Sequence, residues 1–214
     1  MTIYALTLIS CGFSRDERKL SSDEIILKSI SFHDPNSQWN TFYDTMNFES
    51  SFSFNDSIPE DLELTFNNKE SYFKYFNHDR KVEIEYRPNS CNASPNNSLC
   101  GNYSWTYGFY PYIWGLPMKL NDPGIKPEKG FKKTVLNSDS VWEIQVNYEA
   151  ENFWFYFDEK DYQLKGFKFI KNDSTNHAEI VILKDLKEVN GIKFPKHRTW
   201  LNLDSTLIGT NELK

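Results

Sequence analysis

With 214 residues, the chain is long enough for a single domain with a sizeable core. Its formal net charge of -6 at pH 7 argues against nucleic-acid binding, which needs a concentrated basic face to displace the counterions of phosphates. Aromatic residues make up 16% of the chain and all hydrophobic residues only 39%, so much of the apolar mass lies in Phe, Tyr and Trp, which favours sheets over helices.

The N-terminus resembles the end of a bacterial lipoprotein signal peptide. An apolar run from Ile3 to Ile9 leads into Ser10, Cys11 and Gly12. The apolar stretch would enter the translocon, the small Ser10 would admit the peptidase, and the Cys11 thiol would accept a diacylglycerol. We therefore expect residues 1–10 to be a lipoprotein signal peptide, Cys11 to be lipidated, and residues 11–21 to form a lipid-anchored tether.

Two features complicate this interpretation of the N-terminus. The apolar run is short and no Lys or Arg precedes it, which a start codon placed too far downstream would explain. The alternative is a buried first strand with Cys11 as an ordinary core thiol.

No later run approaches the roughly 18 apolar residues that a membrane-spanning helix requires. We expect an outer-membrane lipoprotein of the cell envelope that faces the periplasm or the cell surface. This expected location depends on the N-terminus alone.

The expected domain covers residues 22–214 and begins with a helix over about 22–32, because capping and acidic residues precede apolar residues at near-helical spacing. The segment from His33 to Ser37 stops this helix, since the residue before a proline avoids the helical region. Alternating apolar and polar residues then predict strands separated by Asn- and Asp-rich turns, as in antiparallel meanders. The clearest strands are predicted at 62–66, 72–76, 82–86, 141–148, 153–157, 164–170 and 178–183, with further strands near Ile192 and at 201–207.

Cys91 and Cys100 flank an Asn- and Ser-rich segment that has little ability to fold by itself. In an oxidising compartment we expect them to form a disulfide that clamps this loop and stabilises the fold by roughly 2 to 3 kcal/mol. The alternative is two free thiols. A zinc site is less favoured, because C-x-x-C spacing is absent and the four histidines are scattered, so no metal and no cofactor is expected.

The densest aromatic cluster in the chain lies between Tyr103 and Leu120. Pro111 and Pro117 disfavour a central strand or a long helix, so we expect a loop or a short broken helix laid across a sheet face. This segment could line an apolar pocket, since Tyr and Trp rings combine a large area with polar tips. The alternative is a plug that covers the open side of the sheet, and both can hold at once. The candidate cavity residues are Trp105, Tyr107, Phe109, Tyr110, Tyr112 and Trp114.

No pattern in the sequence indicates catalysis. The chain has no G-x-S-x-G elbow, no H-E-x-x-H motif and no glycine-rich phosphate loop. His33 and Asp34, beside Trp39, are the one pair that could serve as an acid/base site, and a helix-terminating turn explains them better. We therefore predict that the protein is not an enzyme and has no catalytic residues.

Several turn and strand-start motifs carry a resemblance to known proteins. They are His33-Asp34-Pro35 before Trp39, residues 117–124, Phe155-Tyr156-Phe157-Asp158 with Leu164-Lys165-Gly166, and residues 189–195. These motifs resemble an uncharacterised family of envelope proteins from Gram-negative bacteria, which looks distantly similar to the lipoprotein carriers LolA and LolB, and the similarity covers most of the mature chain. It implies a mainly β (α+β) fold: a curved antiparallel sheet that forms an incomplete barrel, with the N-terminal helix and the aromatic loop on its concave side. In that wider fold the hollow holds acyl chains.

The leading hypothesis is therefore a membrane-anchored envelope lipoprotein that binds a lipid or other apolar ligand, such as an acyl chain, in a half-barrel cavity. Its partners would be the membrane, reached through the lipid anchor, and that ligand. The alternative is a structural or interaction lipoprotein of an envelope complex, with a filled core. An enzyme of unrecognised type is the third hypothesis.

Overall fold

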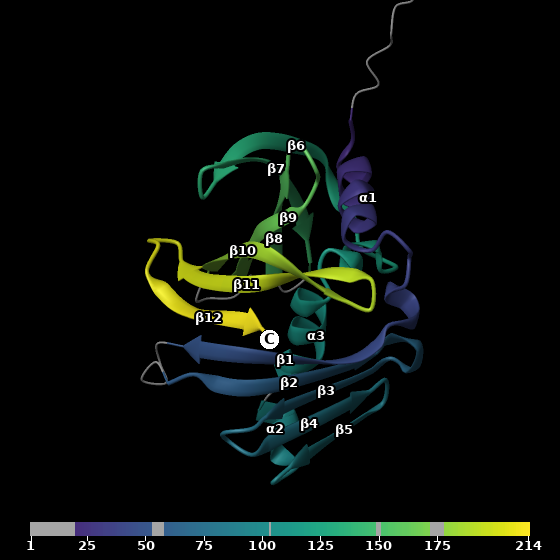
Figure 1. Cartoon of the computed structure of the whole chain (residues 1–214), viewed down its shortest axis with the longest axis vertical. Helices are drawn as coiled ribbons and strands as arrows, with labels where there is room; N and C mark the ends of the chain where they lie inside the picture. Colours follow the sequence, from purple (N-terminus) through teal and green to yellow (C-terminus); the bar gives the residue numbers. More distant parts are fainter. Residues whose placement is uncertain (1–19, 53–57, 103, 149–150, 172–177) are drawn as a thin grey trace, which may run out of the picture.

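A single curved antiparallel sheet dominates the computed structural model, which describes residues 20–52, 58–102, 104–148, 151–171 and 178–214. In these residues twelve strands follow the order β5-β4-β3-β2-β1-β12-β11-β10-β9-β8-β7-β6. Every pairing is antiparallel, and β5 and β6 remain as the two edges, so the sheet curls without closing. Figure 1 shows it wrapped around the helix α3. The predicted incomplete barrel is confirmed.

The strands join mostly through short turns, as the meander prediction expects. In the turn between β10 and β11, Asn190 and Gly191 both have positive φ values, of 49° and 76°, which is the geometry that tight hairpins favour. The strands are β1 (Tyr43–Phe52), β2 (Glu60–Asn67), β3 (Tyr72–Asn77), β4 (Val82–Arg87), β5 (Ser90–Ser94), β6 (Pro127–Leu136), β7 (Asp139–Asn147), β8 (Glu151–Asp158), β9 (Leu164–Lys171), β10 (Ala178–Val189), β11 (Ile192–Asn202) and β12 (Leu207–Leu213).

The N-terminal helix α1 (Ser22–His33) forms where the sequence predicts it. A capping box starts the helix: the Ser21 hydroxyl accepts a hydrogen bond from the Glu24 amide, and the Glu24 carboxylate accepts one from the Ser21 amide. Ile25 and Ile26 are buried, and the helix contacts β6, β11 and the 3-10 helix η4 (Met118–Asn121). α1 therefore packs beside the open edge of the sheet (Figure 1).

The remaining helices are short. They are α2 (Ser98–Asn102), α3 (Ser104–Trp114), and the 3-10 helices η1 (Trp39–Thr41) and η3 (Asn68–Glu70). The aromatic segment is thus a helix rather than a loop, and the break expected at Pro111 does not occur, because Pro111 lies inside α3. The main core fills the space between α3 and the concave face of the sheet, where buried residues of most strands meet Ile113, Trp114 and Leu116.

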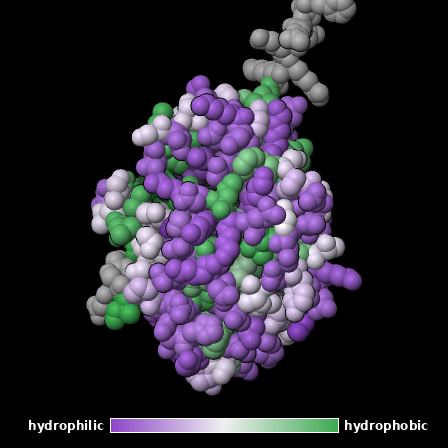
Figure 2. Space-filling view, viewed as in Figure 1, coloured by the Kyte–Doolittle hydropathy of each residue, from purple (hydrophilic) through white to green (hydrophobic). Residues whose placement is uncertain are grey.

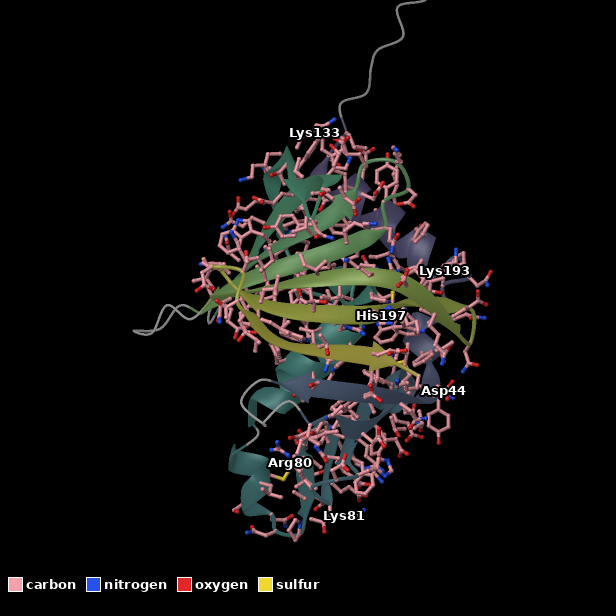
Figure 3. The ribbon with its side chains drawn as sticks, turned by 60° about the vertical axis from the view of Figure 1, so that its left-hand side comes forward. Asp44, Arg80, Lys81, Lys133, Lys193 and His197 are labelled. Carbon is pink, nitrogen blue, oxygen red and sulfur yellow. A yellow bond between two sulfur atoms is a disulfide. The ribbon has the colours of Figure 1, made fainter. Side chains whose placement is uncertain are left out.

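The outer face of the sheet is mostly charged, but it is not uniformly wet. Figure 3 shows the labelled His197 on this outer side, where its imidazole lies 2.9 Å from the Asp185 carboxylate. Farther along the sheet, a second small apolar cluster contains Val141, Tyr156 and Ile182. β7 therefore buries an apolar side chain, Val141, on the outer face as well as others on the concave face.

One predicted strand is wrong, and four strands, β1, β5, β6 and β12, have no counterpart among the strands predicted by residue range. Residues 201–207 are not a strand, because β11 ends at Asn202 and the chain turns there, with the Asn202 amide bonded to the Thr206 carbonyl. The Asp204 carboxylate accepts hydrogen bonds from the amide and hydroxyl of Thr206, which stabilises the turn. The spacing of the leucines in this segment resembles the apolar and polar alternation of a strand, which explains the wrong prediction. The edge strand β6 was not predicted, since it does not alternate cleanly, and β5 was not predicted, since it is only five residues long and its two apolar positions are Cys91 and Ala93.

The predicted signal peptide and Cys11 lie outside the described residues, as does all of the predicted tether except its last two residues. Those N-terminal expectations therefore stay predictions. In the part of the chain that is described, no helix combines the length and apolar character needed to cross a membrane.

Candidate functional site

The helix α3 occupies the hollow of the sheet, and its described aromatic side chains pack on the concave face. Each of the four predicted cavity residues described there meets an aromatic partner from the sheet, so this part of α3 takes the plug position. Whether these residues also contact a ligand stays a prediction. The ring centroids lie 5.3 Å apart for Phe109 and Phe169, 5.8 Å for Tyr110 and Tyr75, 5.6 Å for Tyr112 and Phe153, and 4.1 Å for Trp114 and Phe48. Trp105 and Tyr107 belong to the same helix, but their side chains lie outside the described residues.

A groove of about 820 Å³ opens at the end of the hollow, between β2–β5 on one side and the end of α3 with η4 on the other. Aromatic residues from neighbouring strands form its base. Phe66 of β2 pairs with Phe73 of β3, and Phe73 pairs with Tyr86 of β4. Trp39 extends this row, with its ring centroid 6.1 Å from that of Phe66. We call these four residues the aromatic row; all are buried, and all line the groove.

The opposite wall of the groove comes from the end of α3 and from η4. It includes Pro111, Lys119 and Asp122, and the Lys119 ammonium lies 3.0 Å from the Asp122 carboxylate. Gly115 permits this wall to approach the aromatic row, because a Cβ there would lie 2.6 Å from the Trp39 ring. A side chain at position 115 would therefore clash with Trp39, Lys119 and Pro111, all of which line the groove.

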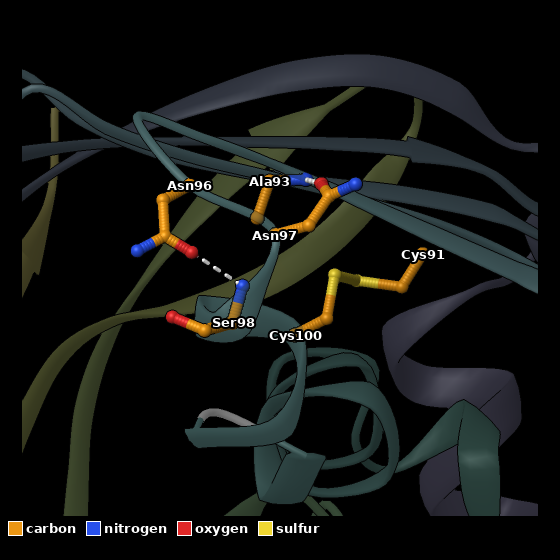
Figure 4. Close-up of a disulfide and its surroundings, with 6 residues drawn as sticks. All are labelled: Cys91, Ala93, Asn96, Asn97, Ser98 and Cys100. Atoms are coloured by element: carbon orange, nitrogen blue, oxygen red, sulfur yellow. Dashed lines mark hydrogen bonds between the residues drawn. A yellow bond between two sulfur atoms is a disulfide. The ribbon is translucent and has the colours of Figure 1, made fainter.

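A disulfide between Cys91 and Cys100 holds one end of the groove (Figure 4). Cys91 pairs with Tyr86 across β4 and β5, next to the aromatic row, and the bond joins β5 to α2. Asn side chains order the segment between the two cysteines: Asn97 accepts from the Ala93 amide at 2.8 Å, and Asn96 accepts from the Ser98 amide at 2.6 Å. The disulfide predicted from the sequence is thus present in the structure.

Sequence reasoning missed a buried arginine on the concave face. Arg198 of β11 is 1% exposed, and its guanidinium carbon lies 3.8 Å from the centre of the Trp114 ring. Nη1 donates to the Pro195 carbonyl at 2.9 Å, whereas Nε has no hydrogen-bond partner among the described residues. Burial lowers the pKa of Arg198 well below its ordinary value. The sequence contains a signal for this burial. Side chains in a strand alternate between its two faces, so Arg198 falls on the same inward face as Phe194 and Trp200.

Comparison with known families now places the chain. The sequence model of a family described as "Family of unknown function (DUF6503)" matches residues 91–211, which is more than half of the chain. The chain belongs to this family. No curated protein matches it. The expected relation to an uncharacterised, LolA-like family is confirmed by this match together with the solved structures described next.

Two solved structures share the fold of this DUF6503 member. A LolA superfamily protein, NE2245 from Nitrosomonas europaea, is 6% identical with a TM-score of 0.54, and the match covers 92% of each chain. A domain from Vibrio parahaemolyticus, provisionally named an outer membrane lipoprotein-sorting protein, is 9% identical with a TM-score of 0.54 over 89% of each chain. At such low identity these matches show a shared LolA-like fold.

The His33 and Asp34 pair has a structural role in this DUF6503 member. The Asp34 carboxylate accepts hydrogen bonds from the amides of Gln38 and Trp39, at 2.8 and 2.9 Å, which forms the turn after α1. His33 is fully buried, and its Nε2 accepts from the Leu164 amide at 3.2 Å, so its Nδ1 carries the proton donated to the Lys193 carbonyl. The imidazole therefore joins α1 to β9 and β11, in agreement with the predicted helix-terminating turn.

Acidification should weaken the fold through His33. Burial lowers the pKa of His33 to about 4, against 6.5 for the free side chain. Between these values the unfolded chain binds a proton that the folded chain does not, so stability is retained above pH 6.5 and falls as the pH drops toward 4. The full loss is about 3 kcal/mol. Guanidinium unfolding from pH 7.5 to 4 measures it.

Two variants control this pH experiment. In His33→Gln the part of the slope due to His33 should disappear, whereas His78→Gln, which changes a partly exposed imidazole, should keep the wild-type slope. Equal slopes for wild type and His33→Gln would show that His33 does not carry the effect.

Proposed function

We propose that this protein is a membrane-anchored envelope lipoprotein that binds an apolar ligand, such as an acyl chain, in the hollow of its half-barrel and catalyses no reaction. The groove of about 820 Å³ beside the aromatic row carries this proposal. Its volume falls within the roughly 300 to 1,000 Å³ that is usual for small-molecule sites. The lipid anchor would be attached at Cys11, and the location would be the periplasmic or outer face of the outer membrane.

The fold supports this proposal in a general way. One structural neighbour is named for lipoprotein sorting and the other for the LolA superfamily, and both share the curved sheet with this chain. The ionisable groups that line the groove also suit binding better than chemistry. Lys119 is paired with Asp122, and the Arg87 guanidinium lies 4.6 Å from the Tyr72 ring centre, so both cations already interact with other residues of the groove wall.

The uptake of a fluorescent fatty acid tests the groove. Asn40 is exposed in η1 and lines the groove, so the indole of Asn40→Trp should occupy its mouth and weaken uptake at least tenfold. Lys69, exposed in η3 and not part of the lining, provides the matched control, and Lys69→Trp should bind like wild type. The measurement is a titration of each full-length variant after copurified lipid has been removed.

The three proteins separate the outcomes of this titration. Equal uptake by all three proteins would show that the fatty acid binds outside the groove. No uptake by the wild type would contradict the binding function itself.

The second candidate is an interaction lipoprotein with a filled core, and the plug position of α3 favours it. Such a protein should display an apolar patch for its partner. The face in Figure 2 is instead mostly hydrophilic, with small and separate apolar areas. If the wild type takes up the fatty acid and Asn40→Trp does not, the result favours the binding function over the interaction function.

A further inference from the structure

The concave face of the sheet carries two neighbouring hydrogen-bond donors that no described residue satisfies. They are Nε of Arg198 and Nε1 of Trp114, in side chains that are 1% and 2% exposed. The two side chains are in contact, with the guanidinium carbon 3.8 Å from the ring centre. Leaving a buried donor unpaired is unfavourable, so two together indicate an acceptor that belongs there.

The charge of the site is also uncompensated. Among the described residues no Asp or Glu carboxylate bonds to Arg198, whose one protein acceptor is the Pro195 carbonyl. Isolated buried cations are rare, because a low-dielectric interior stabilises charge poorly unless an opposite charge is near. The site therefore favours an acceptor that carries a negative charge.

The ring contact does not use the N–H groups of the guanidinium. Trp114 lies over the face of the guanidinium, whereas guanidinium N–H bonds point outward in its plane. Pro195 accepts from Nη1, and the edge that carries Nε is the edge through which arginine binds a carboxylate with two parallel hydrogen bonds. A flat monoanion fits that edge and balances one positive charge.

The surroundings extend this partly polar site. On the inward face of the neighbouring strands, the Asn211 side chain accepts from Trp200 Nε1 at 2.6 Å and donates to the Ser50 hydroxyl at 2.7 Å. Trp114 follows Pro111, which lines the groove, by three residues, or about one helical turn. The arginine thus lies about one turn of α3 beyond the groove.

We propose that Arg198, with Trp114 Nε1 beside it, anchors the carboxylate of a fatty-acid-like ligand whose apolar tail lies along the aromatic groove. This assignment rests on the proposed binding function and specifies its ligand class as a monoanionic amphiphile. A neutral lipid would leave both donors and the charge unsatisfied.

Laurate and methyl laurate, which differ in charge at the head, test the anchor on the full-length protein freed of copurified lipid. The wild type should bind laurate at least tenfold more tightly than the ester at pH 7.5. In Arg198→Met, which keeps the length of the side chain and removes the charge, the two affinities should become equal. In Lys196→Met, a charge removal on the same strand at a side chain that pairs with Glu212 on the outer face, the preference should remain.

The comparison of the two ligands on the wild type needs no variant, so it holds even if Arg198→Met folds poorly. Equal binding of laurate and ester by the wild type would overturn the anchor while leaving the binding function intact. Binding of neither ligand would overturn both. An NMR signal of Arg198 Nε–H that shifts with laurate and not with the ester would support the anchor, and one that moves with neither would indicate that water alone satisfies the donor.

Discussion

Replacing His33 with leucine should lower the free energy of unfolding by about 4 kcal/mol, because one buried and one part-buried backbone group lose their partner at once. The imidazole accepts from the Leu164 amide and donates to the Lys193 carbonyl, and leaving each buried group unpaired costs about 1 to 3 kcal/mol. Leucine has a similar volume, so a cavity contributes little to this loss. Guanidinium unfolding at pH 7.5 measures the change.

A histidine elsewhere gives the control for this substitution. His78 has a side chain that is 43% exposed and lies 3.7 Å from Glu63, so His78→Leu should change the unfolding free energy by less than about 1 kcal/mol. If the two variants lost similar amounts, the joining of α1 to β9 and β11 by His33 would not be a main support of the fold.

Removing the Trp114 side chain should cost about 3 to 5 kcal/mol. Trp114 is 2% exposed and lies between Phe48, at 4.1 Å between ring centroids, and the Arg198 guanidinium. Trp114→Ala therefore opens a large cavity at the centre of the core and removes the cation–π contact. Thermal or guanidinium unfolding followed by circular dichroism measures the loss without depending on tryptophan fluorescence.

Trp154 provides the matched control for Trp114. Its ring lies on the outer side of β8, half-buried, with the Lys168 ammonium 4.1 Å from its centre. Trp154→Ala should cost about 1 kcal/mol. A loss of that size in Trp114→Ala as well would indicate that α3 packs loosely and that the hollow of the sheet is not filled by the helix.

Much of the fold could be predicted because its signals are local. Ser21 and Glu24 form the capping box that begins α1, and Asp34 forms the turn that ends it. The central strands alternate apolar and polar residues because one face packs on α3. Asn190 and Gly191 mark a hairpin through their tolerance of positive φ. The disulfide followed from two cysteines that flank a short polar segment.

What could not be predicted depends on long-range packing. Pro111 suggested a break, yet α3 continues through it because the surrounding sheet packs on both sides of the proline. Val141 is buried on the outer face, in a small cluster with Tyr156 of β8 and Ile182 of β10. The groove joins Trp39, Phe73 and Lys119, whose proximity only the curvature of the sheet determines. The inward position of Arg198 could have been predicted from the alternation of residues along β11. Its lack of an acidic partner could not.

Intact mass spectrometry of the protein, purified gently from its native host membrane, tests the central claim most directly. Spectra recorded under native and then denaturing conditions separate covalent from bound mass. The account predicts an apolar adduct that is lost on denaturation and a retained covalent mass at Cys11. A native spectrum with no adduct, from a protein whose hollow also takes up no added fatty acid, would contradict ligand binding and leave the filled-core interaction protein.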